Sequence, residues 1–261
     1  MNKTCIVIVG PTAVGKTPFA IEIARHFETD IISADSRQCY RELNIGVAKP
    51  SSHYLQQVKH YFINSHSIHH EVNAKLFEEY ALQSVYEIFA SHEVAVVVGG
   101  TGLYVKAFCE GLDAIPEVDP EIRKRVISSF KANGLPWLQK EIEQQDPRFF
   151  SMGEIQNPQR MMRALEVKLS TGRSVVEFHS HRRNSRDFKI VKAGLNLPKE
   201  QLHQNINARV NKMMEEGLLD EVKALYPCKN INALQTVAYN ELFDHLEGKI
   251  SLDKAIEQIK T

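Results

Sequence analysis

The feature that most constrains the fold is the segment Gly10-Pro-Thr-Ala-Val-Gly-Lys-Thr17, which fits the pattern G-x-x-x-x-G-K-[ST]. It follows the short β-branched run Cys5–Val9 and precedes apolar residues at helical spacing, so the sequence predicts a strand, a loop and a helix. In such a loop the backbone N–H groups bind phosphate, Lys16 reaches phosphate oxygens and the Thr17 hydroxyl is placed for Mg²⁺. The pattern, which ATP-binding proteins share, predicts a site for a phosphate chain and does not specify a nucleotide.

The rest of the chain predicts an α/β fold with a P-loop core and a doubly wound parallel sheet. Ile31–Ile32 and Val94–Val98 are apolar runs typical of buried parallel strands. Residues 74–90 place apolar side chains at helical spacing and supply a crossover between such strands. The alternating segment Phe188–Leu197 predicts a strand that returns to the sheet, and a helix follows from Glu200 to a break at Gly217.

A helical insertion domain is expected between Pro116 and this returning strand. We assign residues 1–114 to the first part of the core, 115–186 to a basic helical insertion domain and 187–261 to the C-terminal part of the core. Residues 121–192 hold 15 lysines and arginines against 8 acidic residues, a balance of +7 that the net charge of zero conceals. Such local basic density is typical of a surface that binds a polyanion, although a solvated helical subdomain has the same composition.

Composition excludes several classes of protein. The cysteines show no paired spacing typical of a disulfide framework or a zinc site, and the His66, His69, His70 cluster is best interpreted as a solvated loop. No apolar run reaches the length of a membrane span, and no signal-peptide pattern opens the chain. We therefore expect a cytoplasmic protein, monomeric and without membrane contact.

A carboxylate follows one predicted strand and is missing after another. P-loop NTPases commonly place an aspartate for Mg²⁺ at the end of a second apolar strand, yet Val94–Val98 ends in Gly99-Gly100-Thr101. Asp35 instead follows Ile31–Ile32, at the sheet edge where open α/β folds bind ligands. Asp35 is either a general base or a turn residue.

Several spaced motifs together resemble the tRNA dimethylallyltransferases, also called tRNA isopentenyltransferases. The resemblance extends over nearly the whole chain and rests on Gly10–Thr17, Ile31–Gln38 with Ile45-Gly46 and Ala48-Lys-Pro50, Gly99–Tyr104, Asp119–Arg123, Asn157–Glu166, and His203-Gln204 with Arg209-Val210. It implies that dimethylallyl diphosphate occupies the P-loop, with Mg²⁺ as cofactor, and that the acceptor is the exocyclic N6 amine of the adenine 3′ of the anticodon. The anticodon stem-loop of tRNA would then be the macromolecular partner.

The resemblance also implies individual roles. Asp35 would be the general base, with Thr17, Lys16 and Arg209 as the other catalytic residues and Thr17 at the metal. The diphosphate would be bound by Arg209 and by the loop residues Gly10, Pro11, Thr12, Ala13, Val14, Gly15, Lys16 and Thr17. The tRNA would be contacted by Asp35, Ser36, Arg37, Gln38, Thr101, Arg123, Gln159, Arg160, Met161, Met162, Arg163 and Tyr239. For Arg160 and Arg163, three residues apart on a predicted helix, the alternative is a solvated stripe.

This sequence departs from the family pattern in places. Val14 and Val47 replace polar residues, and the family's aliphatic-Gly-Tyr-Lys stretch is Val237-Ala-Tyr-Asn240 here. Relatives continue beyond the position of Thr261 with a basic helix that contacts tRNA, so we expect either a truncated chain or weaker RNA affinity. Three alternatives stay open: a P-loop kinase of a small metabolite, a transferase acting on free adenine nucleotides, and an RNA-binding protein with impaired catalysis.

Overall fold

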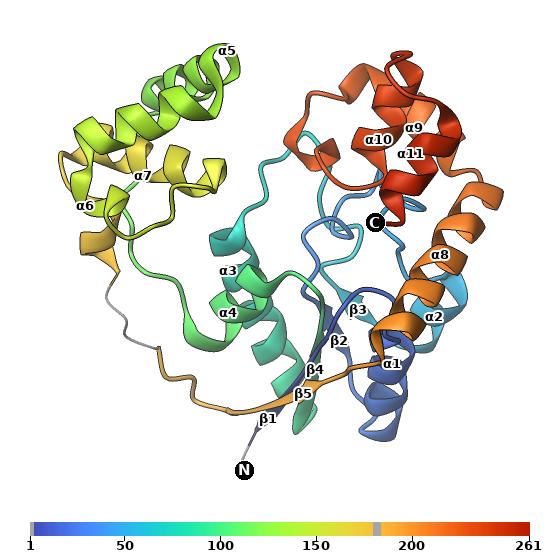
Figure 1. Cartoon of the computed structure of the whole chain (residues 1–261). Helices are drawn as coiled ribbons and strands as arrows, with labels where there is room; N and C mark the ends of the chain where they lie inside the picture. The colour runs from blue at the N-terminus through green and yellow to red at the C-terminus, as the bar shows by residue number, and fades with distance from the viewer. Residues whose placement is uncertain (1–2, 180–183) are drawn as a thin grey trace. The chain divides into compact units, whose positions relative to one another are not determined.

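The computed structural model describes residues 3–179 and 184–261 (Figure 1). It separates into two compact units, the first made of Met1–Gly111 with Asn184–Thr261 and the second of Leu112–Arg183. The chain leaves and rejoins the first unit at neighbouring points, since the Asn184 backbone N–H donates to the Glu110 carbonyl oxygen at 2.8 Å. Each unit has its own hydrophobic core.

A parallel sheet forms the centre of the first unit. Within the described residues its order is β3-β2-β4-β1-β5, and every strand pair in it is parallel. The strands are β1 (Thr4–Val9), β2 (Ile31–Ser33), β3 (His60–Tyr61), β4 (Val94–Val98) and β5 (Lys189–Gly194). The predicted parallel α/β fold is confirmed, including the returning strand β5, which pairs with β1 at the edge of the sheet.

Side chains alternate between the two faces of this sheet, and helices cover both faces. Val7 and Val97 belong to the core that contains α3 and α4, whereas Ile8 and Val96 belong to the core that contains α1. Because both faces are buried, the central strands are apolar except for Thr4 at the start of β1 and Ser33 at the end of β2. The helices of this unit are α1 (Lys16–His26), α2 (Ser52–Gln57), α3 (Ala74–Phe89), α4 (Gly102–Glu110), α8 (Lys199–Glu215), α9 (Leu218–Leu225), α10 (Tyr239–Leu246) and α11 (Leu252–Ile259).

The second unit is helical, and its helices begin at strong N-caps. Asp119, Asp146 and Asn157 each accept a hydrogen bond from the first turn of the helix that follows, and each precedes a proline at the first helical position. The helices are α5 (Pro120–Gln145), α6 (Pro147–Phe150) and α7 (Pro158–Thr171). Helix α5 is kinked at Gly134, which has a φ of 71°.

No helix in the described ranges is long and apolar enough to cross a bilayer.

Candidate active site

The predicted phosphate loop connects β1 to α1, and its backbone has little room for change. Gly15 has a φ of 96°, which glycine adopts without steric cost. A Cβ atom at Gly10 would lie 2.6 Å from the Leu195 carbonyl oxygen, so the segment after β5 packs directly on the loop. Ala13 has a φ of 63°, an uncommon conformation for a residue with a side chain.

Lys16 lies on the first turn of α1, and its ammonium group folds back over the loop. Its Nζ donates hydrogen bonds to the carbonyl oxygens of Gly10, at 2.9 Å, and Pro11, at 2.7 Å. Burial, followed by repulsion from Arg209, lowers the pKa of Lys16, and the Asp35 carboxylate opposes this shift. The two cations and the carboxylate therefore lie close enough to influence one another's charge.

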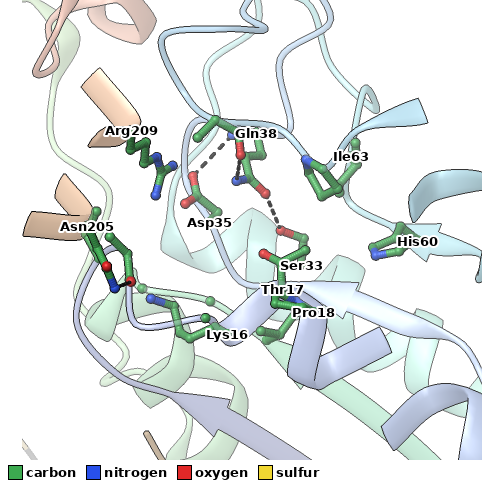
Figure 2. A pocket seen from close by; sticks show the side chains of 18 of the residues that line it. Lys16, Thr17, Pro18, Ser33, Asp35, Gln38, His60, Ile63, Asn205 and Arg209 are labelled. Atoms are coloured by element: carbon green, nitrogen blue, oxygen red, sulfur yellow. Dashed lines mark hydrogen bonds between the residues drawn. The ribbon is translucent and has the colours of Figure 1, made fainter. Parts of the chain in front are cut away.

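A cavity of about 430 Å³ opens over the loop and contains these charged groups. Figure 2 shows Lys16 and Asn205 on one side, Asp35 and Ser33 in the middle, and Ile63 and His60 on the other. The expected nearness of Asp35 to the phosphate loop is confirmed. The lining residues are Thr12, Ala13, Gly15, Lys16, Thr17, Pro18, Ser33, Asp35, Gln38, Ala48, Pro50, His60, Ile63, Val98, Gly99, Gly100, Asn205, Ala208 and Arg209.

The Asp35 carboxylate is oriented by the turn that follows β2. Its Oδ1 accepts hydrogen bonds from the backbone N–H groups of Arg37, at 2.8 Å, and Gln38, at 3.2 Å. Ser36 donates its N–H to the Thr101 hydroxyl at 3.0 Å, which connects this turn to the start of α4. Asp35 is thus both a turn residue and a residue of the cavity, so the two interpretations of the sequence are compatible.

The approach of β4 to this turn requires glycine. A Cβ atom at Gly99 would lie 2.1 Å from the Ala34 carbonyl oxygen, closer than any side chain can be. A Cβ atom at Gly100 would meet only the Lys16 ammonium group, at 3.9 Å. Gly99 and Gly100 therefore stand after β4, where P-loop NTPases commonly have an aspartate. At Gly99 any side chain would clash with the turn beside Asp35.

Two residues expected to contact tRNA have partners within the chain. Arg37 donates to the carbonyl oxygens of Asn232, at 3.0 Å, and Gln235, at 3.3 Å. The Gln38 Nε2 donates to the carbonyl oxygens of Val47, at 3.2 Å, and Ala48, at 3.1 Å. Gln38 lines the cavity, whereas Arg37 holds the loop before α10 against the turn.

Helix α8 contributes a cation to the cavity together with a residue that the sequence analysis missed. Arg209 lines the cavity, and burial lowers its pKa while the Asp35 carboxylate opposes this effect. Asn205 lies one helical turn earlier, and its Nδ2 donates to the Ala13 carbonyl oxygen at 3.1 Å. The sequence could have indicated Asn205, because it lies four residues before Arg209 and residues i and i+4 share one face of a helix. His60 and Ile63, near the short strand β3, had no comparable signal.

Tyr239 and Met161 were predicted to contact tRNA, and their burial corrects this prediction. The Tyr239 side chain is completely buried, and its hydroxyl donates to Glu221 Oε1 at 2.6 Å. Met161 is likewise completely buried in the core of the second unit, and Met162 is 7% exposed. Side chains without exposed surface cannot contact RNA, so Tyr239 and Met161 stabilise the fold and Met162 packs mainly in the same core.

The polar members of that set in the second unit lie at its surface. Arg123 and Gln159 are exposed, and so is Arg160, whose Nη1 lies 2.5 Å from the Glu154 carboxylate. Arg163 has 43% of its side chain exposed, and its Nη1 lies 3.8 Å from Glu166. An exposed ion pair contributes little to stability, so Arg160 can exchange Glu154 for a phosphate group at small cost.

Comparison with known proteins identifies the family. The sequence profile of the IPP transferase family matches residues 38–261. The chain belongs to this family. A tRNA dimethylallyltransferase of Christiangramia forsetii is 44% identical over 260 residues, which cover 100% of this chain and 86% of that protein. The crystal structure of the full-length tRNA isopentenylpyrophosphate transferase from Bacillus halodurans has 31% identity and a TM-score of 0.70, over 99% of this chain and 82% of that one.

Membership of the IPP transferase family confirms the resemblance inferred from the spaced motifs. A second relative, tRNA dimethylallyltransferase 1 of Bacteroides thetaiotaomicron, is 41% identical over 257 residues, which cover 98% of this chain and 83% of that protein. These comparisons favour a transferase over a metabolite kinase and over an RNA-binding protein without activity.

Proposed function

We propose that this chain transfers the dimethylallyl group of dimethylallyl diphosphate to the exocyclic N6 amine of the adenine 3′ of the anticodon in tRNA. The observation that supports this reaction is one cavity that combines a phosphate loop, two cations and a carboxylate. Lys16 and Arg209 suit a diphosphate leaving group, and Asp35 suits the removal of a proton. The names of the relatives point to the same reaction.

The loop side of the cavity stabilises the leaving group. As the allylic C–O bond breaks, negative charge accumulates on the diphosphate, and fixed cations at that position lower the barrier most. The loop amides, Lys16 and Arg209 would supply this stabilisation. The Lys16 ammonium group, which now donates to two loop carbonyls, would exchange them for diphosphate oxygens.

Mg²⁺ is the cofactor that this site suits. In the described ranges no three His, Cys, Asp or Glu side chains are grouped to hold a metal ion, so a cage made of protein ligands alone is not the expected geometry. Mg²⁺ commonly takes one or two protein ligands and completes its coordination with substrate phosphates and water. The Thr17 hydroxyl, which lines the cavity, would be such a ligand. When bound, Mg²⁺ adds positive charge at the leaving diphosphate.

Asp35 would remove the proton from the attacking amine. Its Oδ1 is held by two backbone N–H groups, which leaves Oδ2 as the oxygen for the substrate. The amine nitrogen forms a bond to the allylic carbon, the bond from that carbon to diphosphate breaks, and the amine proton passes to the carboxylate. Thr101, connected to the same turn through Ser36, would border the entry of the adenine, which must leave its stack to reach the cavity.

The second unit would bind the anticodon stem-loop. Its exposed residues Arg123, Gln159 and Arg160 offer donors for phosphate oxygens, and Arg163 is partly exposed on the same helix as Arg160. Backbone contacts of this kind provide affinity without base specificity. We propose that the protein acts in this way as a cytoplasmic monomer.

The decisive experiment incubates the protein with unmodified tRNA, Mg²⁺ and labelled dimethylallyl diphosphate. Label should appear in the tRNA. Asp35→Asn should lower kcat by about 10²- to 10⁴-fold, the range for loss of a general base, and leave diphosphate affinity nearly unchanged. Asp220→Asn, at an exposed carboxylate on α9, is the matched control and should retain full activity. Label entering AMP, or phosphate transfer from ATP to a metabolite, would overturn the proposal.

A further inference from the structure

The segment from β5 to α8 supports the phosphate loop from outside at two points. At the start of the loop, Leu195 donates its N–H to the Val9 carbonyl oxygen at 2.8 Å and places its own carbonyl against Gly10. In the middle of the loop, the Asn205 side chain donates to the Ala13 carbonyl oxygen at 3.1 Å (Figure 2). The second contact joins residues 192 positions apart and comes from a side chain that itself lines the cavity.

The Asn205 hydrogen bond fixes the orientation of a peptide group in the loop. Ala13 has a φ of 63°, in a region that residues with a side chain seldom occupy, so surrounding contacts must maintain it. A trans peptide is planar, with its C=O and N–H pointing in opposite directions. Because the Ala13 carbonyl faces Asn205, the N–H of Val14 is directed away from α8. That N–H belongs to the set of loop amides that bind phosphate.

Asn205 also connects the loop to the cation on the same helix. Arg209 is four residues later, and both side chains line the cavity. Residues at this spacing share a helix face, so a bond from Asn205 to the loop fixes where Arg209 stands relative to the loop amides. The Asn205 side chain thus fixes the position of the Arg209 guanidinium group relative to the backbone N–H groups of the loop.

We propose that Asn205 is a positioning residue that sets the affinity of the cavity for the diphosphate group, by holding the Ala13–Val14 peptide and keeping Arg209 aligned with it. The inference rests on the proposed function for its substrate, and it assigns Asn205 no part in the proton transfer to Asp35. Loss of Asn205 should therefore weaken binding of the diphosphate substrate and of released diphosphate, and change turnover at saturation much less.

The test measures the affinity for inorganic diphosphate by calorimetry, in the presence of Mg²⁺. Asn205→Ala should weaken binding by about 3- to 10-fold, the loss expected for one hydrogen bond. Asn205→Asp keeps the shape of the side chain but removes its donor and adds a negative charge, so it should weaken binding more than Asn205→Ala. The control is Asn207→Ala, an exposed asparagine on the same helix, which should bind as the wild type does.

Kinetics then separate positioning from a structural role. In the transfer assay, Asn205→Ala should raise the KM for dimethylallyl diphosphate by the same 3- to 10-fold and keep kcat within about twofold. Unchanged diphosphate affinity in Asn205→Ala, or tighter binding by Asn205→Asp than by Asn205→Ala, would overturn the inference. Absence of transfer by the wild type would instead refute the proposed function, because diphosphate binding is measured without the reaction.

Discussion

Tyr239 is expected to stabilise the core, and Tyr239→Phe tests this by removing only the hydroxyl group. The hydroxyl donates to Glu221 Oε1, and the same carboxylate accepts the backbone N–H groups of Ile45, at 2.8 Å, and Gly46, at 3.1 Å. The ring packs against Gly46, where a Cβ atom would lie 2.6 Å from it. The substitution removes the hydroxyl and preserves the ring.

The expected loss follows from these contacts. A buried hydrogen bond to a charged group contributes about 1.5–3 kcal/mol, but phenylalanine also avoids burying a hydroxyl, and Glu221 keeps its two backbone donors. We therefore expect Tyr239→Phe to lower the free energy of unfolding by about 1–2 kcal/mol. Glu221→Ala leaves three partly buried donors without their acceptor and should cost about 3–5 kcal/mol. In the Glu221→Ala background, Tyr239→Phe should cost little, because its partner is gone.

Guanidinium unfolding followed by circular dichroism measures these differences. The single tryptophan, Trp137, packs in the core of the second unit, so its fluorescence transition should not move. Tyr86→Phe is the matched control, since that hydroxyl donates to Asp187 at the surface and should contribute less than about 0.5 kcal/mol. If Tyr239→Phe kept full stability and instead weakened tRNA binding, the conclusion that Tyr239 is a core residue would be wrong.

Three further outcomes are expected. Gly99→Ala should abolish transfer because its Cβ collides with the backbone of Ala34, next to Asp35, whereas Gly100→Ala should retain activity; equal effects in the transfer assay would contradict this. Diphosphate affinity should fall at alkaline pH as Lys16 loses its proton, at a midpoint below 10.5, and Arg209→Gln should move that midpoint to higher pH, because Arg209 lowers the pKa of Lys16. Arg160→Ala should reduce the slope of log affinity for tRNA against log salt by about one, and an unchanged slope would exclude a phosphate contact.

The sequence was sufficient to predict the central sheet and its crossover helices. β1 and β4 are continuous apolar runs because both faces of the sheet are covered, and α3 shows helical spacing because one side packs on the core. The strand β3 could not be predicted, since two residues are too few for any periodic pattern. Its position matters, because it places His60 in the wall of the cavity.

The site was predictable where its residues belong to local motifs. The phosphate loop and Asp35 stand beside recognisable strands, so their proximity follows from the topology of a parallel sheet. The contact from Asn205 to Ala13 and the burial of Tyr239 depend on how distant segments pack. No local pattern states that Glu221, on another helix, accepts the hydroxyl of Tyr239.

The chain leaves the first unit at Gly111 and rejoins it at Asn184, and these two points lie side by side. The Asn184 N–H donates to the Glu110 carbonyl oxygen, and a Cβ atom at Gly111 would lie 2.3 Å from the Asn184 side chain. A few residues could therefore bridge 111 to 184 without disturbing the strand order of the sheet. Residues 112–183 could therefore be exchanged as a whole. Selection could lengthen, recharge or replace these residues while the cavity over the phosphate loop stays the same.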